Sequence, residues 1–202
     1  MKNTIVKDTL AITLITLVAG LALGGIQGIT AEPIAQQRQL AKEEAYKAVF
    51  SDADSFETIV EAEDPEIEAY LDESGYPSQT INEVVQALDA SGSPIGYAFT
   101  VTTSEGYGGD IQFAMGVKDD NTMNGISILT IAETAGLGMK ADTDEFKSQF
   151  ADKNVEKFEY TKNGATEDSQ IDALSGATIT TNAMVNGVNA GLCAFTYEKG
   201  GN

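Results

Sequence analysis

The chain has 202 residues, of which 42% are hydrophobic, so its length and composition suit one folded domain with an appendage and exclude a wholly disordered protein. Its 31 acidic and 12 basic residues give a formal charge of −19, which excludes a nucleic-acid-binding surface because such a surface needs excess positive charge. The sequence contains no histidine, which removes the usual general base, the usual zinc ligand and the imidazole-dependent hydrolytic triads.

The N-terminal region predicts a single transmembrane helix. Residues 9–29, "TLAITLITLVAGLALGGIQGI", carry no charged side chain and are long enough to cross a bilayer. A cleaved signal peptide is the alternative, although its apolar region would be shorter and would end in a small-x-small cleavage site. Lys2 and Lys7 precede the span, and the next basic residue is Arg38. The positive-inside rule therefore predicts a cytoplasmic N-terminus, with the rest of the chain outside the cytoplasm.

Helix and strand patterns follow the span in order. The stretch after Pro33, "IAQQRQLAKEEAYKAVF", has helical spacing and predicts a helix up to Phe50. The acidic segment from Asp52 to Glu73 shows weak periodicity, which indicates a surface elaboration with solvated charges. Four β-like runs separated by turn clusters then predict an antiparallel meander; they span residues 81–90, 94–103, 110–117 and 125–131.

The C-terminal part predicts a short helix capped near Thr143, a strand around Lys157 to Tyr160 and a final helix from about Thr180 to Phe195. One side of that last helix carries Val185, Val188, Leu192 and Phe195. Its neighbour Cys193, in "NAGLCAF", is interpreted as a buried core residue rather than a reactive thiol. The predicted fold class is α+β, a twisted antiparallel sheet flanked by helices and preceded by one N-terminal transmembrane helix.

We expect three regions along the chain. Residues 1–31 form the cytoplasmic tip and the transmembrane helix. Residues 32–79 form a helical and acidic connecting region packed on the domain, and residues 80–202 form an extracytoplasmic domain.

The stretch "DALSGATITT", residues 172–181, approaches the start of the final helix with small side chains. The first amides of a helix have no partner within the helix, and the helix dipole favours negative charge there, so a phosphate beside Thr178 would be stabilised. Gly176 allows close backbone approach, and Ala177 adds little bulk. The alternative interpretation is an Asx turn from Asp172 followed by an ordinary threonine cap.

Two glycine-rich stretches precede this one: "SEGYGGDI", residues 104–111, and "IAETAGLGMKAD", residues 131–142. Each could be a turn by itself. In this order, however, the three stretches resemble the FMN-binding domain found in the G subunit of the Rnf electron-transport complex and in the equivalent C subunit of the sodium-pumping NADH:quinone oxidoreductase. Those families share a Gly-Tyr-Gly-Gly turn, a Glu-Thr-Pro-Gly-Leu-Gly loop and an Asp-x-x-Ser/Thr-Gly-Ala-Thr motif. The proline of that loop is Ala135 here, which makes the loop less rigid.

The resemblance implies that FMN is joined covalently through its phosphate, as a phosphoester, to the hydroxyl of Thr178. A threonine hydroxyl is a weak nucleophile without a base, so a separate flavin transferase that uses FAD and a divalent metal is expected. The resemblance assigns the other cofactor-binding positions as Asp172, Ser175, Gly176, Ala177 and Thr180 around the attachment point, Glu133, Thr134, Gly136, Leu137, Gly138 and Lys140 in the loop, and Tyr107 and Gly108 in the turn.

The resemblance also implies an electron relay with no catalytic residues and no metal site of its own. Its partners would be the other membrane subunits of an Rnf complex, which couples electron flow between reduced ferredoxin and NAD to sodium or proton translocation across the cytoplasmic (inner) membrane. Chain length and spacing favour the G subunit of Rnf over the C subunit of the sodium pump. The alternatives are a membrane-anchored FMN-binding regulatory or flavin-delivery module, and a structural anchor whose glycine stretches are only turns.

Overall fold

The computed structural model describes residues 2–60 and 64–200, and the chain divides into two compact units, residues 1–41 and 42–202. Helix α1 (Lys2–Val49) begins in the first unit and ends in the second. The expected span and the expected helix after Pro33 are therefore one helix, with Pro33 inside it. Its N-terminal part is long and apolar enough to cross a membrane, and its apolar side chains are exposed from Ile5 to Ile29.

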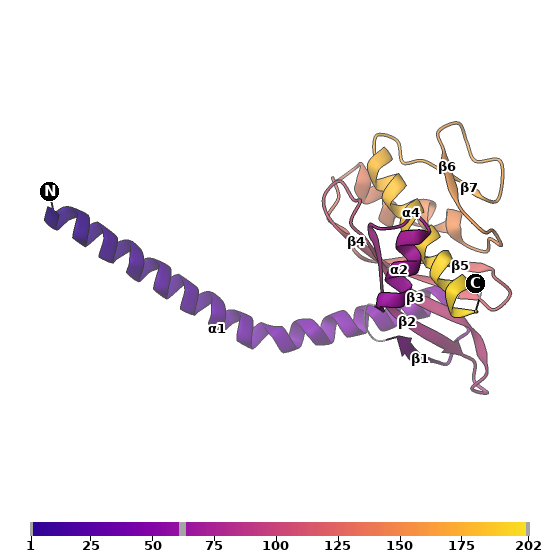
Figure 1. The fold of residues 1–202 in the computed structure, drawn as a ribbon, viewed down its shortest axis with the longest axis horizontal. Coiled ribbons are helices and arrows are strands. Elements are labelled where there is room, and N and C mark those ends of the chain that lie inside the picture. The colour runs from indigo at the N-terminus through magenta and orange to yellow at the C-terminus, as the bar shows by residue number, and fades with distance from the viewer. Residues whose placement is uncertain (1, 61–63, 201–202) are drawn as a thin grey trace. The chain divides into compact units, whose positions relative to one another are not determined.

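The second unit is built on a five-stranded antiparallel meander in which neighbours in sequence are neighbours in the sheet (Figure 1). Its strands are β1 (Ser55–Val60), β2 (Gln79–Leu88), β3 (Pro94–Thr103), β4 (Ile111–Lys118) and β5 (Met123–Thr130). All four expected strands are present as β2 to β5. The α+β prediction is confirmed, since helices lie against both faces of this sheet.

The acidic segment contains regular structure that was not predicted. It holds the edge strand β1 and helix α2 (Pro65–Glu73), while its residues 61–63 lie outside the described part of the chain. The side chain of Asp64 caps α2 by accepting a hydrogen bond from the Glu66 N–H, and Ile67 and Leu71 are buried one turn apart. The segment is thus more than a surface elaboration, because its two buried apolar residues are enough to dock so short a helix on the core.

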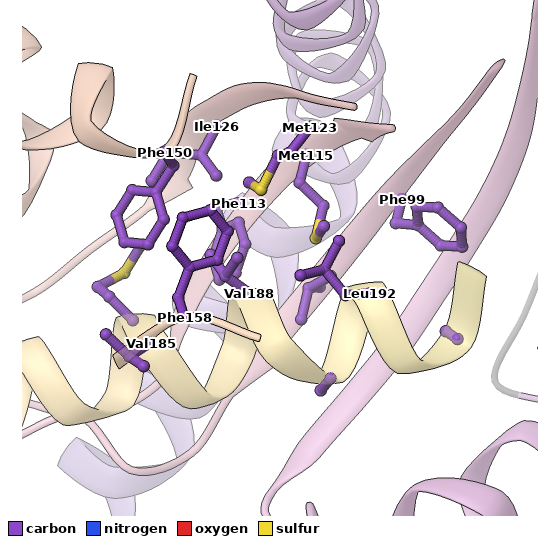
Figure 2. Close-up of a cluster of buried hydrophobic side chains, with 14 of the residues drawn as sticks. Phe99, Phe113, Met115, Met123, Ile126, Phe150, Phe158, Val185, Val188 and Leu192 are labelled. Carbon is purple, nitrogen blue, oxygen red and sulfur yellow. The ribbon is translucent and has the colours of Figure 1, made fainter. Parts of the chain in front are cut away.

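Helix α4 (Thr178–Glu198) packs on one face of the sheet, together with α2. Val185, Val188, Leu192 and Phe195 are all buried there, as predicted, against aromatic and methionine side chains that include Phe113 and Met115 (Figure 2). Glycines bring the helix close to the strands. A Cβ on Gly187 would lie 2.9 Å from the Phe113 ring. Cys193 packs against this cluster as a core residue, although it is half-buried at the edge and not fully enclosed.

The last turns of α1 pack on the opposite face of the sheet. Strand β4 alternates between the two faces, with Phe113 and Met115 toward α4, and Ala114 toward α1. The ring of Phe50, directly after α1, is fully buried where Gly116 leaves room, because a Cβ there would lie 2.9 Å from that ring.

Short elements complete the unit. They are the 3₁₀ helices η1 (Gly138–Asp142) and η2 (Ser148–Phe150), helix α3 (Asp144–Lys147), and the parallel pair β6 (Glu159–Thr161) and β7 (Gln170–Asp172). Thr143 caps α3 as predicted, since its hydroxyl accepts a hydrogen bond from the Phe146 N–H. The strand expected near Tyr160 is β6, and its partner β7 was not predicted.

Candidate functional site

The start of α4 has no side-chain cap. Thr178 is the first residue of the helix, Ala177 stands at the cap position, and the first turn contains no acidic residue. Thr181, one turn later, organises the approach instead: its hydroxyl accepts from the Leu174 N–H at 3.0 Å and donates to the Ala177 carbonyl at 2.9 Å. Gly176 turns the chain into the helix with a φ of +78°. The amides and dipole at this end are thus available to an anion.

The alternative of an Asx turn and a threonine cap does not describe this geometry. The carboxylate of Asp172, at the end of β7, accepts a hydrogen bond from the Ala165 N–H at 2.7 Å, so it holds the connection between β6 and β7. The Asp172 N–H donates to the side-chain oxygen of Gln149. Ser175 and Gly176 are exposed between β7 and α4. The structure therefore leaves the segment before Thr178 accessible while both of its ends are fixed.

Glu133 joins the three sequence stretches. It is only 8% exposed, its Oε1 accepts from the Gly108 N–H at 3.2 Å, and its Oε2 has no hydrogen-bond partner. Gly138 packs between this carboxylate and the first turn of α4: a Cβ there would lie 2.5 Å from Glu133 Oε2 and 2.6 Å from Thr180 Oγ1. The turn, the loop and the start of α4, which lie far apart in sequence, thus meet at one place.

The loop before η1 is closed by its own backbone. The carbonyl of Thr134 accepts from the N–H groups of Leu137 and Met139 at 3.1 and 3.2 Å. These bonds close the loop although Ala135 replaces the proline of the resembled motif. Gly136 has a φ of +76°, which a residue with a side chain rarely adopts. Lys140 is exposed, and its carbonyl accepts from the Thr143 hydroxyl at 2.7 Å.

Large apolar side chains are exposed around this site. Tyr107 is 71% exposed in the turn, Leu137 is 42% exposed in the loop, and Ile179 is 53% exposed next to Thr178. The Leu137 side chain lies close to Gly176, where a Cβ would be 3.1 Å from its Cδ2. In the described part of the second unit, Ile59 is the other exposed large hydrophobic residue. We call Tyr107, Leu137 and Ile179 the apolar rim.

One set of polar residues beside the site was not predicted. Glu105, directly before the turn, accepts hydrogen bonds through Oε2 from the side-chain amides of Asn186 at 2.7 Å and Asn182 at 3.5 Å. Both asparagines lie on α4, four and eight residues after Thr178, and therefore on the same face of the helix. That spacing was visible in the sequence, but their shared partner, 77 and 81 residues away, was not.

These residues fit a ligand that combines an anion with a flat apolar group. The uncapped helix start suits a phosphate. The apolar rim suits a ring system, and the unpaired Glu133 Oε2 suits a hydroxyl or N–H donor. FMN has all three kinds of group. The site also brings together most of the positions that the resemblance assigned, while the carboxylate of Asp172 is bound to Ala165 on the β6–β7 connection.

Comparison with known proteins identifies an FMN-binding domain that contains these residues. Residues 106–192 match the family model of the FMN-binding domain. The chain is 28% identical over 200 residues to the G subunit of the proton-translocating ferredoxin:NAD(+) oxidoreductase complex of Clostridium ljungdahlii, an alignment that covers 99% of this chain and 96% of that one. It is 30% identical over 199 residues to the G subunit of the ion-translocating oxidoreductase complex of Methanosarcina acetivorans, covering 96% and 98%.

A solved structure supports the fold. The crystal structure of Shewanella oneidensis NqrC matches with a TM-score of 0.50 at 18% identity, over 61% of this chain and 62% of that chain. The match shows a shared fold for this part of the chain. Together with the apolar span of α1, identity over nearly the full length of both sequences shows that the chain is a membrane-anchored member of the Rnf family, the G subunits of ion-translocating oxidoreductase complexes.

Proposed function

We propose that the chain carries FMN joined through its phosphate to the hydroxyl of Thr178 and relays electrons within an ion-translocating ferredoxin:NAD oxidoreductase complex. The observation that carries this proposal is the start of α4, where Thr178 is the first residue of a helix without a side-chain cap, beside an exposed apolar rim. The bound flavin supplies the redox chemistry, so the protein needs no acid/base pair of its own.

Different parts of the chain would hold the phosphate and the ring of the cofactor. The amides and dipole of α4 would hold the phosphate, and Gly176, with a φ of +78°, turns the chain into the helix so that these amides follow an exposed segment. The exposed side chains of Tyr107 and Leu137 would border the ring and exclude water from one side of it. The unpaired Oε2 of Glu133 would accept a hydrogen bond from the cofactor, which would remove the cost of an unpaired buried oxygen.

Attachment would require a separate flavin transferase with a divalent metal: the Thr178 oxygen would bond to the FMN phosphorus of FAD, the pyrophosphate bond would break to release AMP, and the transferase would accept the hydroxyl proton. The chain has no histidine to activate the Thr178 hydroxyl. The exposure of Ser175 and Gly176 supports modification by a second protein, because the segment can be reached without unfolding the domain. In this proposal Asp172 contributes by fixing the β6–β7 connection beside the segment.

The relatives' names describe subunits of oxidoreductase complexes that translocate ions, and we infer that this chain also assembles with other membrane subunits. We propose that its N-terminus is cytoplasmic, since Lys2 and Lys7 precede the span. The proposed regions are the anchor, residues 1–31, the connecting region, residues 32–79, and the extracytoplasmic flavin domain, residues 80–202. A covalent bond suits such a location because a flavin lost outside the cytoplasm is not readily replaced.

The proposal is tested by intact mass and peptide mapping of the full-length chain, taken from its native membrane or co-expressed with a flavin transferase. The peptide containing Thr178 should gain the mass of one whole FMN group joined through its phosphate, and Thr178→Ala should abolish this gain. Thr196→Ala is the matched control, because it removes an exposed threonine hydroxyl from the same helix far from the site. An unmodified Thr178 peptide in native material would exclude the covalent relay.

A further inference from the structure

Glu105 connects the glycine-rich turn to α4. Gly187 lets the helix pass close to the end of β3, since a Cβ there would lie 3.6 Å from Thr103 Cβ. Glu105 follows two residues later, and its N–H donates to the Thr103 hydroxyl at 3.4 Å. From there its carboxylate reaches the Asn186 amide at 2.7 Å, a partly buried contact in which one partner is charged.

With this contact, the turn, the loop and α4 are each connected to the other two around the site. On α4, the side-chain amide of Asn186 donates a hydrogen bond to Glu105. Glu105 precedes the glycine-rich turn, and the Gly108 N–H in that turn donates to Glu133. The loop that follows Glu133 returns to α4, because Gly138 packs against Thr180. The contact between Glu105 and α4 is made by side chains alone. Each of the other connections includes the backbone: the Gly108 N–H, the Gly138 backbone or the peptide chain itself. Without it the turn would remain attached to the rest of the site through Glu133 and through Gly108, whose backbone packs against the Ala132 carbonyl.

We propose that Glu105 is a positioning residue that acts through Asn186, and more weakly through Asn182, to fix the glycine-rich turn over the face of α4 that carries Thr178. The inference rests on the proposed function, because it is the ring of the attached flavin whose position this turn would set. Thr178, Asn182 and Asn186 form one stripe on α4, with about 6 Å between successive members along the helix axis. The clamp, meaning Glu105 with these two asparagines, therefore holds Tyr107 and Gly108 beside the flavin's attachment point.

The test uses the full-length chain co-expressed with a flavin transferase and compares variants of the clamp. Glu105→Ala and Asn186→Ala each remove the 2.7 Å contact, while Glu105→Gln keeps a carbonyl oxygen that accepts the same bond. Glu159→Gln is the matched control for the loss of a carboxylate, at an exposed position on β6. Loading at Thr178 is measured by mass, ring mobility by steady-state flavin fluorescence anisotropy, and folding by thermal melting.

We expect Glu105→Ala and Asn186→Ala to be loaded but to lose anisotropy, toward the value of the isolated flavinylated peptide. Glu105→Gln and Glu159→Gln should keep the wild-type value. Asn182→Ala should lose less than Asn186→Ala, because its contact is longer. The double variant Glu105→Ala/Asn186→Ala should lose no more than Glu105→Ala alone, since that substitution already removes the contacts with both asparagines.

Two results would overturn the proposal. If Asn186→Ala lowers the melting temperature and leaves the anisotropy unchanged, the clamp is structural and does not position the ring. If Glu105→Gln behaves like Glu105→Ala, the bond to Asn186 is not how Glu105 acts. The wild-type mass separates these results from failure of the covalent attachment itself: a loaded Thr178 with unchanged anisotropy in the variants refutes the clamp alone.

Discussion

Gly138 shows how closely the site is packed at the level of single residues. Its backbone lies against Glu133 and Thr180, and a Cβ would stand 2.5 Å and 2.6 Å from their side-chain oxygens. Neither neighbour can move freely, because both are buried, and Glu133 also holds the Gly108 N–H. The absence of a side chain at this position therefore sets the spacing between the loop and α4.

We predict that Gly138→Ala lowers the free energy of unfolding by about 1–3 kcal/mol, the usual cost of overpacking, and reduces flavin loading. Urea denaturation of the unloaded full-length chain in detergent measures the first effect, and mass spectrometry measures the second. Gly136→Ala is the comparison: it has open space and a φ of +76°, so it should cost about 1 kcal/mol through backbone strain. Wild-type stability in Gly138→Ala would contradict the described packing.

For single residues, the sequence allowed predictions that depend on neighbouring positions. It did not allow prediction of contacts between residues far apart in the chain. The small residues before a helix start indicated that an anion could bind beside Thr178, which is a local pattern, and the resemblance assigned Thr178 as the attachment point. The pairing of Glu105 with Asn186 depends on how β3 and α4 come together in the folded chain. Asp172 is a second example. The motif that contains it indicated a cofactor site, but the sequence did not show that its carboxylate accepts a hydrogen bond from the Ala165 N–H.

The last turns of α1 illustrate the element scale. The Tyr46 hydroxyl donates to Glu83 Oε2 at 2.9 Å and lies 2.7 Å from Thr100 Oγ1, and Lys42 makes an ion pair with the same Glu83. Burial, reinforced by the Glu83 charge, raises the pKa of Tyr46 above its ordinary value near 10. These contacts fix the end of the helix on the sheet through a neutral phenol.

The raised pKa gives a prediction for alkaline stability. Folding favours the protonated phenol, so its contribution is complete below pH 10 and is lost as the pH rises above the unfolded-state pKa. Tyr46→Phe should lower stability at pH 8 by about 1 kcal/mol and make the decline above pH 10 shallower by about 1.4 kcal/mol per pH unit. Urea titrations at pH 8 and 11 measure both, with the exposed Tyr107→Phe as control. An unchanged alkaline slope would contradict the role of Tyr46.

Elements with a buried face were predicted, and elements with few buried residues were missed. Strands β2 to β5 and helix α4 bury regular patterns that the sequence shows directly. Strand β1 is an edge strand with mostly exposed side chains, so it lacks the alternation of a half-buried strand. Helix α2 did carry a start signal, Asp64 followed by Pro65, but the surrounding acidic residues favoured a solvated segment.

At the scale of the whole molecule, the described buried hydrophobic residues all lie in the second unit, beginning with Ala45. The first unit contributes apolar side chains that are exposed along α1 and suited to lipid. The fold class and family could be predicted from the whole sequence because the meander, the span and the three stretches occur in a fixed order. The exact division between the units could not, because α1 continues through it.

We predict that residues 32–202 fold without the span and melt close to the temperature of the full-length chain. Pro33 would then stand in the first turn of a shortened α1, where proline is well tolerated. Residues 51–202 lack Tyr46 and Phe50, and they should be less stable by several kcal/mol or remain unfolded. Circular dichroism melting compares the two fragments. Equal stability would show that the end of α1 is not part of the folded unit.

The open start of α4 also bears on how long the protein survives in a cell. A helix end without a side-chain cap and a buried carboxylate oxygen without a partner would both gain partners from a bound flavin, so binding would stabilise the fold. Filling the site lowers the population of unfolded chains, which are the ones that proteases degrade. Proteases would then degrade mainly the chains that have not received flavin, and the amount of this protein would follow the supply of flavin.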